Sequence, residues 1–114
     1  MTPYELNVRG AGANSDRVVV DLVGELDLTN AREFEERLEE LSTNGDVSLV
    51  LDVNRVVFID SAALHVLFRT ARRLGRERFG LVVDPTAIIA RTLAIVGMQE
   101  VAWVGSSTEE VAPS

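Results

Sequence analysis

A carboxylate, a hydroxyl and an imidazole lie close together near the middle of the chain. Asp60 and Ser61 follow a short apolar run, and His65 comes four residues after the serine. Aspartate and serine are common at helix starts, where their oxygens accept hydrogen bonds from the first free amides. A helix start also places a serine hydroxyl beside free amides and the positive end of the helix dipole, which suits an added phosphate. Ser61 is therefore predicted to be either a helix cap or a phosphate acceptor.

The same three residues have the composition of a hydrolase triad. Ser61 and His65 could touch at i, i+4 on a helix, but Asp60 directly precedes the serine and has no evident path to the far nitrogen of the histidine. The G-x-S-x-G pattern of a nucleophile turn is absent. A small serine hydrolase that uses Ser61 is the weakest alternative, and we expect no catalytic residue.

The other candidate sites have ordinary structural explanations. Gly10–Gly12 precedes a predicted strand and does not join a strand to a helix, so it is no dinucleotide-binding motif. Glutamates between residues 35 and 40 are typical of a solvated helix face, and Asp52 and Asp84 of turns or caps. We therefore predict no metal site and no cofactor.

The helix expected after Asp60 carries two faces. Its apolar face is predicted to consist of Ala63, Leu64, Leu67, Phe68, Ala71 and Leu74. An adjacent stripe holds Ser61, His65, Arg69, Arg72 and Arg76. The arginines of this stripe form either an ordinary solvated face or a surface that contacts a protein partner.

The N-terminal third predicts two strands and a helix. Apolar and polar residues alternate over residues 4–9, and residues 18–23 form a second apolar segment closed by Gly24. Asn30 is expected to cap the following helix, with Glu33 as its capping-box partner. The two strands are predicted to form an antiparallel pair.

From residue 47 onward, strands alternate with helices. The expected elements are a strand at 47–53, a turn at 54–55, an extended segment at 56–59, a helix at 61–74, a strand at 79–83, a helix at 86–96 with Pro85 in its first turn, a strand at 100–104 and a short helix within 106–111. The order ββαβαβαβ(α) predicts an α/β fold with a mixed, mostly parallel sheet and packed helices. One domain is expected to fill residues 1–114, with its core at about 4–111.

Length, charge and composition exclude several classes of protein. The 114 residues suit one domain, and the 46% hydrophobic content excludes general disorder. A net charge of −7 argues against direct nucleic-acid binding, which depends on neutralising phosphates. No run approaches the roughly 18 apolar residues of a membrane span, no signal peptide is recognisable, and cysteine is absent. We therefore expect a cytoplasmic protein.

Three segments of the chain resemble the STAS domain, a module shared by bacterial anti-sigma factor antagonists and sulfate-transporter tails. They are Gly24–Asp27 with Ala31, Leu49–Asp52 through Phe58–Ser61 and Leu64, and Val83, Pro85 and Leu93–Gly97. The resemblance covers about residues 4–111. It implies the mixed sheet and packed helices of that family, in a bacterial regulator of transcription.

The resemblance also implies a switch at Ser61. In that family the serine after the signature aspartate is phosphorylated by a partner that is both anti-sigma factor and serine kinase, and Ser61 holds that position. The unphosphorylated protein would bind the anti-sigma factor and free a sigma factor, phosphorylation would end the binding, and a phosphatase would reset it. The implied partner surface consists of Asp27, Asp60, Ser61, Ala62, His65, Arg69 and Arg72.

The chain departs from the family directly after the serine. Ala63 and His65 stand where the family commonly has glycine, which suggests a specialised partner. The alternative function is a STAS scaffold, or an accessory subunit of a membrane transport complex, that carries no phosphate on Ser61.

Overall fold

A five-stranded sheet runs through the described residues, which are 3–10, 17–43 and 47–107 of the computed structural model. The strands are β1 (Tyr4–Gly10), β2 (Arg17–Leu26), β3 (Ser48–Ile59), β4 (Phe79–Val82) and β5 (Trp103–Gly105), and the helices are α1 (Ala31–Leu41), α2 (Ser61–Leu74) and α3 (Ile88–Ile95). The strands lie side by side in chain order; β1 is antiparallel to β2, and the other neighbours are parallel. The predicted α/β fold with a mixed, mostly parallel sheet is confirmed.

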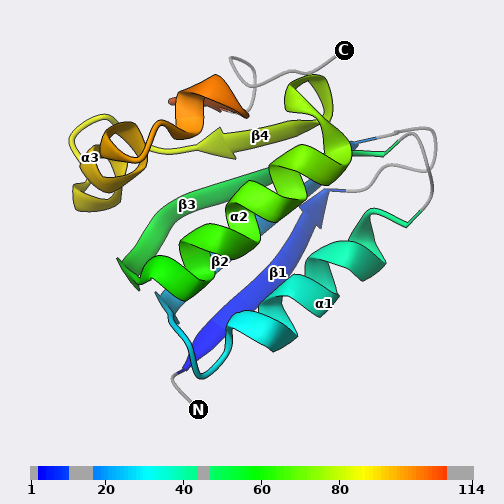
Figure 1. The fold of residues 1–114 in the computed structure, drawn as a ribbon, viewed down its shortest axis with the longest axis horizontal. Coiled ribbons are helices and arrows are strands. Elements are labelled where there is room, and N and C mark those ends of the chain that lie inside the picture. Colours follow the sequence, from blue (N-terminus) through cyan, green and yellow to red (C-terminus); the bar gives the residue numbers. More distant parts are fainter. Residues whose placement is uncertain (1–2, 11–16, 44–46, 108–114) are drawn as a thin grey trace.

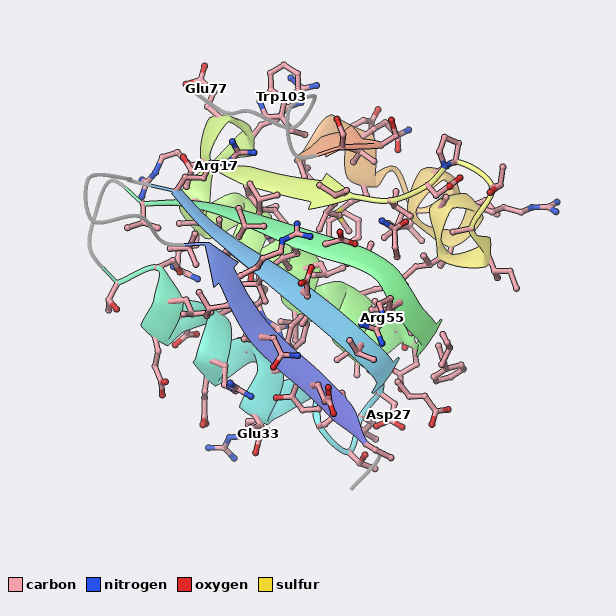
Figure 2. All side chains as sticks on the ribbon, turned by 180° about the vertical axis from the view of Figure 1, so that it is seen from behind. Arg17, Asp27, Glu33, Arg55, Glu77 and Trp103 are labelled. Atoms are coloured by element: carbon pink, nitrogen blue, oxygen red, sulfur yellow. The ribbon has the colours of Figure 1, made fainter. Side chains whose placement is uncertain are left out.

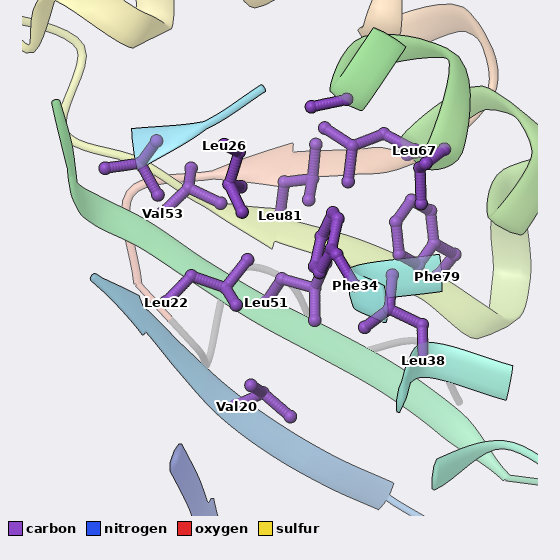
Figure 3. Close-up of a cluster of buried hydrophobic side chains, with 14 of the residues drawn as sticks. Val20, Leu22, Leu26, Phe34, Leu38, Leu51, Val53, Leu67, Phe79 and Leu81 are labelled. Atoms are coloured by element: carbon purple, nitrogen blue, oxygen red, sulfur yellow. The ribbon is translucent and has the colours of Figure 1, made fainter. Parts of the chain in front are cut away.

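The helices α1 and α2 lie against one face of the sheet (Figure 1). Seen from behind, the strands are in front, and no helix of the described residues crosses them (Figure 2). The core therefore lies between the sheet and the helices. Phe34 and Leu38 of α1 meet Leu51 of β3, Leu81 of β4 and Leu67 of α2 there, and each is fully buried (Figure 3). Burial of such a side chain stabilises the fold by about 1.5–3 kcal/mol.

The strand β3 is longer than the sequence predicts. The expected turn at residues 54–55 is wrong, because β3 continues without a break from Ser48 to Ile59. Its pairing with β2 contains two irregularities, and at the second one Val57 is an extra residue between Val56 and Phe58. Such β-bulges bend a strand while the ladder continues. The polar Asn54 is therefore carried on an exposed stretch of strand and not in a turn.

The entry into α1 also differs from the prediction. Asn30 occupies the cap position but makes no side-chain cap hydrogen bond, and Glu33 accepts a hydrogen bond of 2.8 Å from the hydroxyl of Tyr4. The capping box is therefore wrong. The reason lies in β2, which continues through Gly24 to Leu26 and leaves a tight loop that uses the Asn30 amide.

Gly24 is required inside β2. Its φ of 102° lies in the region that favours glycine, and an added Cβ would lie 2.7 Å from the backbone oxygen of Pro3. This close approach places the start of β1 against β2.

The buried side of α2 is broader than predicted. Val66 and Thr70 are buried, whereas Leu64 and Phe68 are only partly buried. The hydroxyl of Thr70 donates a 2.8 Å hydrogen bond to the Val66 carbonyl, which satisfies it inside the core. Burial extends to these residues because both the sheet and α1 cover α2 (Figure 1).

The C-terminal elements are shorter than predicted. α3 begins at Ile88 and not at residue 86, because Asp84 accepts hydrogen bonds from the amide and hydroxyl of Thr86 and holds a turn before the helix. These bonds lower the pKa of Asp84. Residues 98–100 form a 3₁₀ helix, so β5 covers 103–105 in place of 100–104. Most of the terminal helix predicted within 106–111 lies outside the described residues.

Candidate functional site

Ser61 is the first residue of α2 and is exposed. Asp60 precedes it in an extended conformation, and its Oδ1 accepts a 3.1 Å hydrogen bond from the amide of Ala63. Of the two residues predicted to cap this helix, Asp60 therefore supplies the cap. The serine hydroxyl is left exposed beside the first turn of α2, where amides and the helix dipole favour negative charge.

The second carboxylate oxygen of Asp60 connects α2 to another loop. Oδ2 accepts a 2.9 Å hydrogen bond from the amide of Leu28, and the amide of Asp60 donates to the Leu26 carbonyl at 3.1 Å. Both oxygens of Asp60 are therefore engaged by backbone amides of α2 and of the β2–α1 loop. This carboxylate connects the start of α2 to the β2–α1 loop. It is not directed at His65 as a triad would require.

The β2–α1 loop is built around Asn30, which is 1% exposed. Its Oδ1 accepts a hydrogen bond from the Asp27 amide at 3.0 Å, and its Nδ2 donates to the Glu25 carbonyl at 2.9 Å. Asp27 in turn accepts from the amide of Thr29 at 2.9 Å. The loop therefore brings Asp27 and Asp60 to the same end of the sheet. The role of Asn30 in holding this loop was not predicted. The spacing of Asp27, Thr29 and Asn30 is a turn signal that could have shown this.

Three further predicted residues lie together on α2. Ala62, His65 and Arg69 line a hollow of about 280 Å³, and α1 and its preceding loop supply the opposite wall through Leu28, Ala31, Arg32 and Glu35. Ala62 is partly buried and His65 is exposed. The neighbouring Ala63 is fully buried, so its methyl group packs in the core and does not reach a partner. His65, by contrast, is exposed and shapes the surface of this hollow.

The arginines of the predicted stripe have different surroundings. Arg69 donates two hydrogen bonds to Glu35 of α1, at 2.6 Å and 3.1 Å, and this pairing raises the pKa of Arg69. Arg76 lies beyond α2, with its guanidinium 4.8 Å from the centre of the Trp103 ring. Arg72 is exposed on α2. The stripe is therefore not one continuous basic surface.

Exposed apolar side chains that the sequence analysis missed lie at this end of the molecule. Val57 and Phe58 precede Asp60 by two or three residues, and Leu28 donates its amide to the same aspartate. The continuous apolar run from Val56 to Ile59 was a signal, because an exposed strand end normally contains polar residues.

The described part of the chain contains neither a group of metal-binding side chains nor a membrane-spanning helix. Its histidine, aspartate and glutamate side chains form no group of three or more that could hold a metal ion. None of its helices has the length and apolar character needed to cross a membrane.

Comparisons with known proteins agree with this geometry. Residues 8–111 match the sequence profile of the STAS domain. A crystal structure of an anti-sigma factor antagonist from Mycobacterium paratuberculosis is 24% identical, with a TM-score of 0.80 over 96% of this chain and 91% of that one. No curated protein matches the chain.

Two structures of the anti-sigma factor antagonist SpoIIAA are also similar. The unphosphorylated form is 22% identical, with a TM-score of 0.64 over 95% of this chain and 92% of that one. The phosphorylated form, described as a Bacillus cell fate determinant, is 18% identical, with a TM-score of 0.61 over 94% and 95% of the two chains. At these identities the likeness establishes the fold.

Proposed function

The chain belongs to the STAS domain family, and from this we propose that it is an anti-sigma factor antagonist controlled by a phosphate on Ser61. The observation on which the proposal depends is the position of Ser61. It is exposed at the start of α2, directly after an aspartate that connects this helix to the β2–α1 loop. Similar structures described as anti-sigma factor antagonists, one of them in a phosphorylated form, support the proposal. Unphosphorylated protein binds an anti-sigma factor that is also a serine kinase, and a sigma factor is released.

The switch is a transfer of one phosphoryl group. The Ser61 oxygen attacks the γ-phosphorus of ATP bound to the kinase, the bond to the β-phosphate oxygen breaks, ADP leaves, and the hydroxyl proton passes to a base of the kinase. A phosphatase then transfers the phosphoryl group to water and restores the hydroxyl. We place both steps in the cytoplasm, where ATP is available, and without direct contact with nucleic acid.

Electrostatics makes the phosphate a block to binding. Phosphoserine adds about −1.5 to −2 charges at pH 7, at the end of the molecule that already holds Asp27 and Asp60. The dipole of α2 stabilises this negative charge by only about 0.3–1 kcal/mol. Burial of an unmatched charge in an interface costs several kcal/mol, and about 4 kcal/mol is roughly a thousandfold in affinity. The interface cost dominates, so the backbone need not refold for binding to end.

The residues proposed to contact the anti-sigma factor are Asp27, Asp60, Ser61, Ala62, His65, Arg69 and Arg72. Their positions differ in kind: Asp60 is held by two amides, Arg69 is paired with Glu35, and His65 is exposed in the hollow between α1 and α2. We propose that His65 selects a specialised partner, because a ring replaces the glycine common in the family.

The test is to isolate the protein from its native host during growth and under stress, and to map phosphate by intact mass and peptide sequencing. The expected result is phosphate on Ser61 with an occupancy that changes between conditions. A host strain carrying Ser61→Ala is the matched control and should lose that phosphate. An unmodified Ser61 in every condition would instead favour the scaffold or transport-accessory alternative. Covalent labelling of Ser61 by an organophosphate would favour a hydrolase.

A further inference from the structure

The outer side of α3 and the end of β3 expose a set of large apolar side chains. Ile88 is 89% exposed, Ile95 is 75% exposed, and Val57 and Phe58 are 77% and 48% exposed. Together with Thr92, these residues are called the α3–β3 surface below. Soluble proteins rarely expose contiguous apolar patches of this kind unless they bind something there.

The members of this surface are contiguous. Val57 and Phe58 line a hollow of about 230 Å³ together with Ile88 and Thr92. Ile95 follows Ile88 by seven positions and therefore lies on the same side of α3, about two turns away. The hollow thus separates an apolar ridge on α3 from an apolar ridge at the end of β3.

The helix α3 is apolar on both its sides. Its inner side places Ile89 and Leu93 in the core, at 6% and 1% exposure. A surface helix normally presents polar residues opposite its core face, whereas the exposed side of α3 holds Ile88 and Ile95 with Arg91 as the one charged residue of the helix. The exposed Ile88 and Ile95 therefore indicate that another molecule covers α3.

Positive charges flank the apolar ridges. Arg91 lies between Ile88 and Ile95 in the chain, and Arg55 precedes Phe58 on the exposed part of β3, on the uncovered face of the sheet in Figure 2. Within the described ranges neither arginine has an ion-pair partner, whereas other arginines do, as Arg69 shows. Acidic residues also adjoin the end of β3: Asp60 follows Phe58 by two positions and is engaged by two backbone amides, and Glu25 is opposite Phe58 in the sheet. Asp84, which precedes α3, is engaged by Thr86.

We propose that the α3–β3 surface binds an amphipathic helix of the anti-sigma factor, with apolar side chains in the hollow and acidic residues toward Arg55 and Arg91. A hollow between two apolar ridges fits helix-in-groove binding. A second copy of this chain fits less well, because pairing through the same surface would bring the arginines of two chains together, and each chain carries −7 overall. The inference rests on the proposed function and adds a second contact beyond Ser61.

The probe is the purified anti-sigma factor that phosphorylates Ser61, and the measurement is its dissociation constant by titration calorimetry. The double variant Ile88→Asp, Ile95→Gln should bind at least about 30-fold more weakly, the ratio expected when an interface hot spot is lost. Arg91→Glu should weaken binding and reverse its dependence on salt. Val8→Asp is the matched control, because Val8 is 49% exposed on β1 and outside this surface; its binding should be within twofold of wild type.

The outcomes separate this inference from the proposed function. Amide spectra first establish that each variant is folded. Suppose that the folded double variant and the folded Arg91→Glu variant both bind within threefold of wild type, while phosphorylation of Ser61 abolishes binding. The proposed function then stands, and the α3–β3 surface is not the docking site. If the wild-type chain dimerises in sedimentation and the double variant is monomeric, a second copy is the occupant and the inference is overturned. If the wild-type chain binds no anti-sigma factor, the proposed function fails first.

Discussion

Replacement of Asp60 tests the claim that one carboxylate organises the candidate site. Asp60 accepts one hydrogen bond from the amide of Ala63 and another from the amide of Leu28, which lies 32 residues earlier in the chain. Loss of a helix cap costs about 1 kcal/mol. Loss of a hydrogen bond to a charged group costs about 1.5–3 kcal/mol, and the lower end applies because the Leu28 bond is exposed. The free energy of unfolding of Asp60→Ala should therefore fall by about 2–3 kcal/mol.

A matched variant separates the two contributions. Asp60→Ser retains a side-chain oxygen that can cap α2 at Ala63 but is too short to reach Leu28 as well. Its free energy of unfolding should fall by only about 1.5 kcal/mol. Both free energies of unfolding are to be measured by urea denaturation with linear extrapolation. The m-value should equal that of wild type, which shows that the variant changes stability and not the surface exposed on unfolding.

The refuting results are specific. If Asp60→Ala is destabilised by less than about 0.5 kcal/mol, neither hydrogen bond stabilises the fold as argued. If Asp60→Ser is as unstable as Asp60→Ala, the cap and the loop contact cannot be separated. An unchanged amide resonance of Leu28 in either variant would show that this amide does not depend on Asp60.

A strained glycine, a partly buried tyrosine and an ion pair between helices each have a measurable consequence. Gly24→Ala should lower the free energy of unfolding by about 1–3 kcal/mol, because the new Cβ would lie 2.7 Å from the backbone oxygen of Pro3. Gly75→Ala is the control: its φ is 87° but the space around it is open, so it should lower the free energy of unfolding by less. Urea denaturation of both variants measures the difference. Burial, followed by the hydrogen bond to Glu33, raises the pKa of Tyr4 to about 12. The unfolded chain therefore loses this proton first, so stability should fall as the pH rises from about 10 to about 12; ultraviolet titration is unambiguous because the chain has one tyrosine, and Tyr4→Phe should abolish this part of the pH dependence. A double-mutant cycle of Arg69→Met and Glu35→Gln should show a favourable coupling that weakens as salt is added, and additive single variants at low salt would contradict it.

The order of strands and helices was predictable because its signals are local. Alternation of apolar residues predicted β1, and the alternation of strand and helix signals from residue 47 onward predicted the parallel part of the sheet. The bounds of α2 were predicted correctly because Asp60 and Gly75, which mark its two ends, are strong local signals.

The errors concern features that depend on neighbouring segments. The polar pair at residues 54–55 predicted a turn, but pairing with β2 keeps β3 extended and absorbs the irregularity as bulges. Asn30 predicted a cap, but the tight loop after Leu26 uses its amide for two backbone groups. A helix was predicted from residue 86, but the turn at Asp84 delays α3 to Ile88.

The sequence by itself determined the element types and the place of Ser61 at the start of α2, because each depends on residues within a few positions of one another. The mixed, mostly parallel sheet then followed from the order of these elements. The tertiary structure decided that Asp60 joins Leu28, that Arg69 pairs with Glu35, 34 residues earlier, and that Ile88 is exposed while Ile89 is buried. Local patterns cannot specify these contacts, because they arise only when β2, α1, α2 and α3 pack around one sheet and each segment acquires neighbours from distant parts of the chain.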